Sequence, residues 1–101
     1  MPRTLPSEAE RLLGNVPGQF TFRCSDGTVL WNLRDLSRTV GNMPDEVFSF
    51  HVSEHKNDFA NWVRDIIGDQ ALARDLLQTR NVATTSRRLT ERVAFLDTRR
   101  G

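Results

Sequence analysis

The segment from Asn57 to Leu77 constrains the fold more than any other part of the chain. Its apolar residues recur with the spacing of two amphipathic helices that each bury one stripe. The stripe of the first helix is Phe59, Trp62, Val63, Ile66 and Ile67, and that of the second is Leu72, Ala73, Leu76 and Leu77. Between them stand Gly68, which can end a helix, and Asp69, which can cap the next one. The pattern predicts a tight helix–turn–helix.

An alternating segment near the N-terminus predicts a β-hairpin. Phe20, Phe22 and Cys24 alternate with polar residues, and an Asp-Gly pair at 26–27 precedes a second short run at 28–30. An Asp-Gly pair between two such runs favours a tight turn between antiparallel strands.

Further helices are indicated on both sides of the helix–turn–helix. Asn32 can cap a helix that runs to about Val40, because apolar residues recur there at helical spacing. Residues 44–52 fit a short helix that begins at a proline and two acidic residues, although their alternation also fits a strand. A last helix begins at Thr85 or Ser86, after a linker without periodicity, and turns its arginines outward.

The chain of 101 residues is long enough to bury one core without disulfides or metals. We expect a flexible N-terminal arm over residues 1–19, a core domain over residues 20–78, and a linker with a basic helix that packs on or extends the core over residues 79–101. The predicted fold is α+β and predominantly helical, with the N-terminal β-hairpin packed on a bundle of about four to five short helices.

Charge and cysteine content narrow the class of protein. The net charge of +1 divides into −3 for residues 1–71 and +4 for residues 72–101. A basic end can bind nucleic acid, an anionic membrane or an acidic protein. The single cysteine, Cys24, indicates a reducing cytoplasmic setting. No apolar run approaches about 18 residues, so we expect neither a membrane span nor a signal peptide, and no membrane partner.

Catalytic and metal-binding patterns are weak. His51 and His55 are four residues apart, which would suit a shared zinc ion on a continuous helix, but the helix cap at Asn57 or Asp58 suggests that the chain turns nearby. Cys24 lies in the alternating segment, which is typical of a small buried residue rather than a nucleophile. We therefore expect no catalytic residue, no metal and no cofactor.

Three groups of residues remain candidates for function. Capping and core burial explain most of residues 51–69 but leave a possible functional surface of His51, Lys56, Asn61 and Asp65. Aromatic residues that fall outside the apolar stripes indicate either a protein-interaction patch or packing on the terminal arm, and they are Trp31, Phe50 and Phe95. The possible contacts to nucleic acid are Arg74, Arg80, Arg87, Arg88 and Arg92.

A longer pattern joins these segments from residue 20 to residue 77. It consists of a phenylalanine-rich hairpin with DG, then L-x-x-L, then D-E-x-F-x-x-H-V, and then KNDFANWV-x-D-x-I/F-GD-x-x-LA. In these motifs the chain resembles a family of small archaeal and bacterial domains of unknown function with the signature HV-x4-NDFANWVRD-x-IGD-x-x-LA. The resemblance implies a shared, mostly helical fold, sometimes fused to other domains, and no chemistry for any residue.

Together these features predict a small, non-catalytic protein-interaction module in the cytoplasm, which binds an unknown protein partner or itself. Nucleic-acid binding through the arginine-rich C-terminal segment is the alternative. A small hydrolytic or metal-dependent activity is the third possibility.

Overall fold

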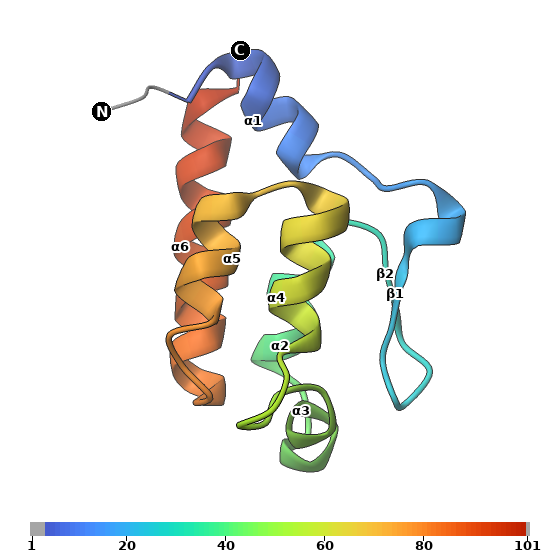
Figure 1. Ribbon diagram of the computed structural model, residues 1–101. Helices are drawn as coiled ribbons and strands as arrows, with labels where there is room; N and C mark the ends of the chain where they lie inside the picture. Colours follow the sequence, from blue (N-terminus) through green and yellow to red (C-terminus); the bar gives the residue numbers. More distant parts are fainter. Residues whose placement is uncertain (1–3, 101) are drawn as a thin grey trace.

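The longest helix, α6, runs along one side of the molecule, and the hairpin lies on the opposite side (Figure 1). The structure is a computed structural model that describes residues 4–100. In chain order its elements are α1 (Pro6–Leu13), the 3-10 turn η1 (Gly18–Phe20), β1 (Phe22–Arg23), β2 (Val29–Leu30), α2 (Leu33–Gly41), α3 (Asp45–His51), α4 (Asp58–Trp62), the π-helical turn η2 (Val63–Ile67), α5 (Gln70–Leu76) and α6 (Val82–Arg99). Helices α1, α2 and α5 pack on α6, and α4 packs on α5. The predicted α+β, mainly helical class is confirmed.

The predicted helix–turn–helix is confirmed at both caps. Asn57 accepts a hydrogen bond of 2.9 Å from the backbone N–H of Ala60, and Asp69 accepts one of 3.1 Å from that of Leu72. Gly68 lies between the helices with φ of 88°, a left-handed conformation that favours glycine. The first helix differs from the expectation in its last turn, which widens to the π-helical turn η2. The capping residues and the turn glycine therefore predict the positions of α4 and α5 correctly.

The hairpin is also confirmed, with β1 and β2 antiparallel and Phe22 opposite Leu30. Its turn contains Gly27 with φ of 93°. The ring centroid of Phe22 lies 5.1 Å from that of Phe59 and 5.8 Å from that of Trp62. The hairpin thus packs on the helical bundle, as predicted, and its contact there is with α4.

Residues 45–51 form helix α3, so the helical interpretation of this segment is confirmed over the strand. Pro44 precedes the first turn, where its missing N–H is not needed. Val47, Phe48 and His51 are buried, and their spacing places them on one side of the helix.

Over residues 4–19 the chain differs from the expected arm, and residues 1–3 of that arm lie outside the described residues. Helix α1 packs on α6 and α2, and Ala9 and Leu12 are only 0% and 1% exposed. These residues are three positions apart, so one side of a short helix buries both. Pro6 occupies the first turn of α1, where proline is well tolerated, so it does not break the helix. The core therefore begins before the boundary expected at residue 20, and the bundle has six α-helices within residues 4–100.

Helix α6 begins at Val82, earlier than the predicted start at Thr85 or Ser86, so the linker before it is shorter than expected. Asn81 caps the helix by accepting a hydrogen bond of 2.9 Å from the backbone N–H of Thr84. Thr85 is 1% exposed and belongs to the buried face of α6. Within residues 4–100 no helix combines the length and the apolar composition that crossing a membrane requires.

Candidate functional site

His51 joins three elements of the fold. Its side chain is 4% exposed, and its ring centroid lies 5.1 Å from that of Phe22 and 5.2 Å from that of Phe59. The ring nitrogen Nδ1 lies 3.0 Å from Oδ2 of Asp58 at the start of α4. The other nitrogen, Nε2, accepts a hydrogen bond of 2.9 Å from the backbone N–H of Ser25 in the hairpin turn. His51 therefore ties α3 to α4 and to the hairpin.

These two hydrogen bonds determine the form of the imidazole ring. Because Nε2 accepts the N–H of Ser25, the proton of the neutral ring must lie on Nδ1, which donates to Asp58. Nε2 is then occupied and is not free to remove a proton from a substrate. Partial burial raises the pKa of Asp58, but hydrogen bonds from His51 and Lys56 outweigh it and hold the pKa below its ordinary value. The pair is suited to holding structure together.

Cys24 is not activated as a nucleophile. Burial, together with the charge of Asp26, raises the pKa of the thiol from 9.0 to about 11. The thiol therefore stays protonated at neutral pH, whereas the thiolate is the reactive form. Within residues 4–100, no three side chains of His, Cys, Asp or Glu lie close enough together to hold a metal ion.

The four residues predicted as a functional surface do not form one surface. His51 is buried, and Asp65 is held on the exposed side of η2 by two hydrogen bonds from Arg64, of 2.9 and 3.1 Å. Lys56 and Asn61 are exposed and line the same cleft. The structure thus brings together only the second pair.

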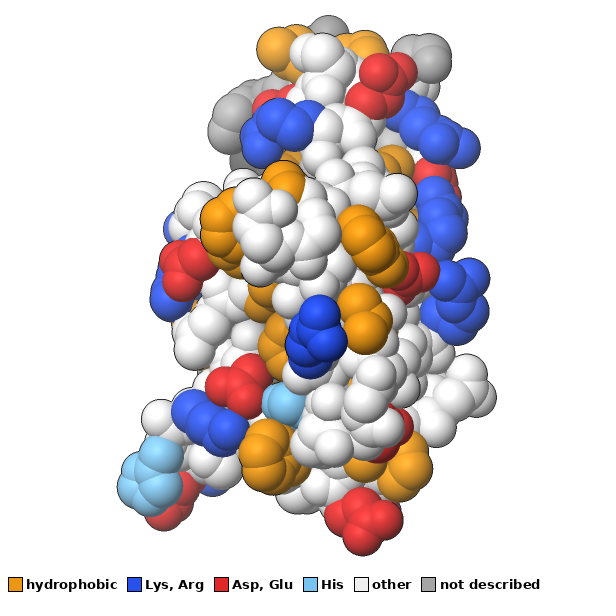
Figure 2. Space-filling model, turned by 90° about the vertical axis from the view of Figure 1, so that its right-hand side faces the viewer, with side chains coloured by type: hydrophobic (Ala, Val, Ile, Leu, Met, Phe, Trp, Pro, Cys, Tyr) orange, Lys and Arg blue, Asp and Glu red, His pale blue; other side chains and the backbone are white. Residues whose placement is uncertain are grey.

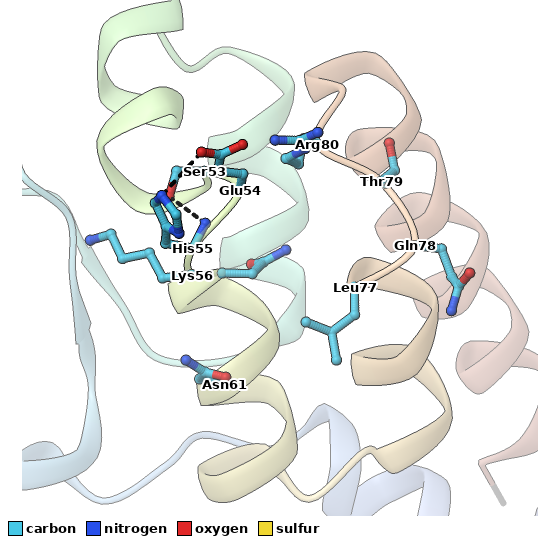
Figure 3. A pocket seen from close by; sticks show the side chains of 10 residues that line it. Ser53, Glu54, His55, Lys56, Asn61, Leu77, Gln78, Thr79 and Arg80 are labelled. Atoms are coloured by element: carbon cyan, nitrogen blue, oxygen red, sulfur yellow. Dashed lines mark hydrogen bonds and ion pairs between the residues drawn. The ribbon is translucent and has the colours of Figure 1, made fainter.

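This cleft lies between the loop over residues 52–57 and the loop over residues 77–81 (Figure 3). Its volume is about 540 Å³, and its lining consists of Ser53, Glu54, His55, Lys56, Asn57, Asn61, Leu77, Gln78, Thr79 and Arg80. Asn57 joins the two sides, because its Nδ2 donates a hydrogen bond of 3.2 Å to the carbonyl oxygen of Leu76. The cleft is therefore a fixed feature with a mainly polar lining.

A second surface lies on the hairpin. Phe20, Val29 and Trp31 are 47%, 38% and 42% exposed. Arg23 stands directly opposite Val29 across the strand pair, so the two side chains share one face, and Trp31 follows two residues after Val29. Trp31 also lies against Gly18 of the same turn as Phe20. We call these residues, Phe20, Arg23, Val29 and Trp31, the hairpin surface. Figure 2 shows this side of the molecule, with hydrophobic side chains around a basic one.

The aromatic residues predicted as an interaction patch are separate from one another. Trp31 belongs to the hairpin surface, whereas Phe50 is on α3 and Phe95 is on α6, at 58% and 37% exposure. Lys56 Nζ lies 4.7 Å from the ring centroid of Phe50, and the guanidinium of Arg92 lies 5.3 Å from that of Phe95. Among the described residues no ring contact links any two of the three aromatics.

One of the arginines predicted to contact nucleic acid, Arg92, forms an ion pair inside the protein. Arg92, which the sequence placed on an outward face, donates two hydrogen bonds of 2.8 and 3.0 Å to Asp69. Asp69 is 2% exposed and also caps α5. A buried carboxylate needs such a partner, because leaving it unpaired in the interior is costly. The outward orientation predicted for Arg92 is therefore wrong.

The other four arginines of this group differ in exposure and in pairing. Nε of Arg87 lies 3.5 Å from Oε1 of Glu91, and Nε of Arg88 is buried without a hydrogen-bond partner. Arg74 and Arg80 are exposed and form no ion pair within residues 4–100. Arg88 forms no ion pair there either, but it is only partly exposed, so Arg74 and Arg80 are the two of these arginines that are both exposed and unpaired.

Sequence reasoning missed several of these residues. Arg23 and Val29 could have been found by pairing the strands outward from the Asp-Gly turn, because residues opposite each other share a face. The alternation predicts that Phe20 is buried, but Phe20 lies in the 3-10 turn before β1, where the alternation no longer applies. The apolar spacing predicts that Leu77 is buried, yet Leu77 is 53% exposed at the cleft.

Comparisons with models of protein families, with curated proteins and with solved structures found no match to the chain. The resemblance carried by residues 20–77 stays a prediction.

Proposed function

We propose that the chain is a small, non-catalytic protein-interaction module that binds a partner protein through the hairpin surface. The observation that carries this proposal is the exposure of Phe20, Val29 and Trp31, each between 38% and 47%, on one small hairpin. Large apolar side chains gathered at a surface are typical of sites that bind proteins. Tryptophan and arginine, both present here, are the residues that most often dominate binding energy.

The hairpin surface is held in place before any partner binds. The indole N–H of Trp62 donates a hydrogen bond of 2.8 Å to the carbonyl oxygen of Phe20. In the turn, the backbone N–H of Ser25 donates a hydrogen bond to Nε2 of His51. A surface that is already ordered loses less conformational entropy on binding. These anchors therefore favour recognition of a partner by a rigid surface.

The charge of the surface favours a different protein over a second copy of the chain. Arg23 is exposed and forms no ion pair within residues 4–100. A symmetric dimer through this small surface would bring two Arg23 side chains near each other, which is unfavourable. A partner with a carboxylate among apolar side chains would instead complement it. Self-association is thus the weaker form of the proposal.

Two further features support a cytoplasmic location and a role without catalysis. Cys24 is a buried free thiol, which suits a reducing compartment such as the cytoplasm. Nε2 of His51 already accepts a hydrogen bond, and the pKa of Cys24 is raised, so neither side chain is prepared for catalysis.

Site-directed cross-linking tests the proposal. A photoreactive amino acid at position 29 is expected to cross-link a partner in cells, whereas one at the exposed position 71 on α5 is not. With the identified partner purified, Trp31→Ala and Arg23→Glu should each weaken binding about tenfold or more. Phe50→Ala removes a still more exposed aromatic outside the hairpin and should leave the affinity unchanged. The proposal fails if the hairpin variants bind the partner like the parent chain.

The alternative is nucleic-acid binding through the arginine-rich C-terminal segment, and the free charges of Arg74 and Arg80 are what favour it. The pairing of Arg92 with Asp69 and of Arg87 with Glu91 counts against it. Titration of a random DNA duplex near 50 mM salt separates the two proposals, because phosphate contacts weaken steeply with added salt. Binding that is strongly salt-dependent and lost in Arg74→Ala and Arg80→Ala would support the nucleic-acid alternative.

A further inference from the structure

The cleft between the two loops is rigidly built. The loop over residues 52–57 is closed by an antiparallel bridge between Val52 and Asn57 and by a hydrogen bond of 2.9 Å from the N–H of Ser53 to the carbonyl oxygen of Lys56. Asn57 then connects this loop to the end of α5. In the facing loop, Thr79 Oγ1 accepts a hydrogen bond of 3.0 Å from the N–H of Asn81. A cleft with fixed walls needs little reorganisation to bind a ligand.

Several polar groups of the cleft are left without partners. The side chains of Asn61, Gln78 and Arg80 form no hydrogen bond or ion pair with the other lining residues (Figure 3). Lys56 differs from them, because its Nζ forms an ion pair with Oδ2 of Asp58 at 2.9 Å. The unpaired positive charge among the lining side chains is therefore that of Arg80.

The mixture of lining groups matches the chemistry of a peptide. Side-chain amides both donate and accept hydrogen bonds, as backbone peptide groups do, and a guanidinium pairs well with a carboxylate. Leu77, 53% exposed, adds an apolar contact. The volume of about 540 Å³ is within the range of small-ligand sites and is much more than an inorganic ion fills.

We propose that this cleft is a second binding site, which takes an extended peptide segment carrying one acidic and one apolar side chain. Arg80 binds the carboxylate, and Asn61 and Gln78 bind the backbone of the segment. Leu77 packs against its apolar side chain. This site uses none of the residues of the hairpin surface, so it does not rest on the function proposed above.

The charge of Glu54 is expected to weaken the binding of an acidic peptide. Figure 3 shows Arg80 on the side of the cleft that faces Glu54, whose Oε1 lies 3.0 Å from Nε2 of His55. The carboxylate of Glu54, in the facing loop, repels the carboxylate of a bound peptide. Removing its charge by Glu54→Gln should therefore tighten binding of the acidic peptide, by about twofold for an exposed charge.

The experiment is a titration of the isotope-labelled full chain, followed through its backbone amide signals by NMR. The probes are the blocked peptide acetyl-Ala-Glu-Leu-Ala-amide, its counterpart with glutamine in place of glutamate, and inorganic phosphate. The acidic peptide is expected to shift the amides of residues 53–56 and 77–80 with a Kd of about 1 mM. The glutamine peptide and Arg80→Ala should each weaken this binding about threefold to tenfold.

Matched variants separate this site from the other arginines and from the hairpin. Arg74→Ala, an exposed and unpaired arginine outside the cleft, and Trp31→Ala should both leave the affinity for the acidic peptide unchanged. The proposal is overturned if the amides of the cleft do not shift with about 10 mM peptide. It is also overturned if both peptides bind equally or if phosphate alone shifts the same amides as strongly. Loss of binding in Trp31→Ala would likewise place the site elsewhere.

Discussion

At the scale of single residues, His51 illustrates how a chemically reactive side chain serves as a structural link. Its Nδ1 pairs with Asp58, its Nε2 accepts the N–H of Ser25, and two phenylalanine rings pack on it. The exposed His55 has none of this, since its side chain is 84% exposed and pairs only with its neighbour Glu54. The two histidines therefore form a natural comparison.

We expect His51→Ala to lower the free energy of unfolding by about 3 kcal/mol, because it removes a buried ring and leaves two polar groups unpaired. His55→Ala should change it by less than about 0.5 kcal/mol. Urea unfolding followed by tryptophan fluorescence measures both. Equal effects of the two substitutions would contradict the structural role of His51.

A second expectation at this scale concerns acid stability. The folded pKa of Asp58 is lower than its ordinary value of 3.8, so its interactions stabilise the fold fully above that pH. This contribution is lost as the pH falls through the still lower folded pKa. Asp58→Asn should therefore lose less stability than the parent chain between about pH 6 and pH 2.5. Parallel pH profiles of urea unfolding for the two proteins would show that the expectation is wrong.

At the scale of elements, Asp69 links α5 to α6. It caps α5 through the N–H of Leu72 and accepts two hydrogen bonds from Arg92 of α6. Its side chain is only 1% exposed, so the charge is compensated in the interior. The junction of α4 and α5 and the packing of α6 thus depend on the same carboxylate.

Removing the carboxylate of Asp69 should strongly lower the free energy of unfolding. We expect Asp69→Ala to destabilise the protein by about 3 to 5 kcal/mol, because it leaves the Arg92 charge unpaired and the cap unmade. Arg87→Ala disrupts an exposed ion pair on the same helix and should change stability by at most about 1 kcal/mol. Thermal unfolding of both variants tests this, and similar melting temperatures for them would rule out the role of Asp69.

At the scale of the whole molecule, the N-terminal helix completes the core. Leu12 of α1 is 1% exposed, and α1 packs on both α6 and α2. Leu5, just before the helix, is 56% exposed. A segment whose composition resembles an arm is thus part of the cooperative unit.

Leu12→Ala should therefore lower the free energy of unfolding by about 3 kcal/mol, as expected for a cavity in a well-packed core. Leu5→Ala should change it by less than about 0.5 kcal/mol. Chemical denaturation of the full chain provides the measurement. If Leu12→Ala were as mild as Leu5→Ala, α1 would not belong to the cooperative core.

The sequence by itself determined the features that depend on near neighbours in the chain. Apolar spacing located the buried faces of α2, α4, α5 and α6, and the caps Asn32, Asn57 and Asp69 accept backbone N–H groups three residues ahead, as their side chains predict. Gly27 and Gly68 adopt the left-handed conformation that few other residues tolerate. Such signals act within a few residues, so they can be identified without the fold.

The tertiary structure alone decided which distant residues meet. Arg92 was predicted to face solvent because helical periodicity cannot reveal a buried carboxylate 23 residues away in sequence. The acceptor role of His51 Nε2 depends on the hairpin turn, 26 residues earlier. Lys56, in the loop, and Asn61, on α4, line one cleft because Asn57, which lies between them in the sequence, is hydrogen-bonded to the end of α5. Long-range packing sets exposure and pairing, and these two properties separate a candidate binding surface from a structural contact.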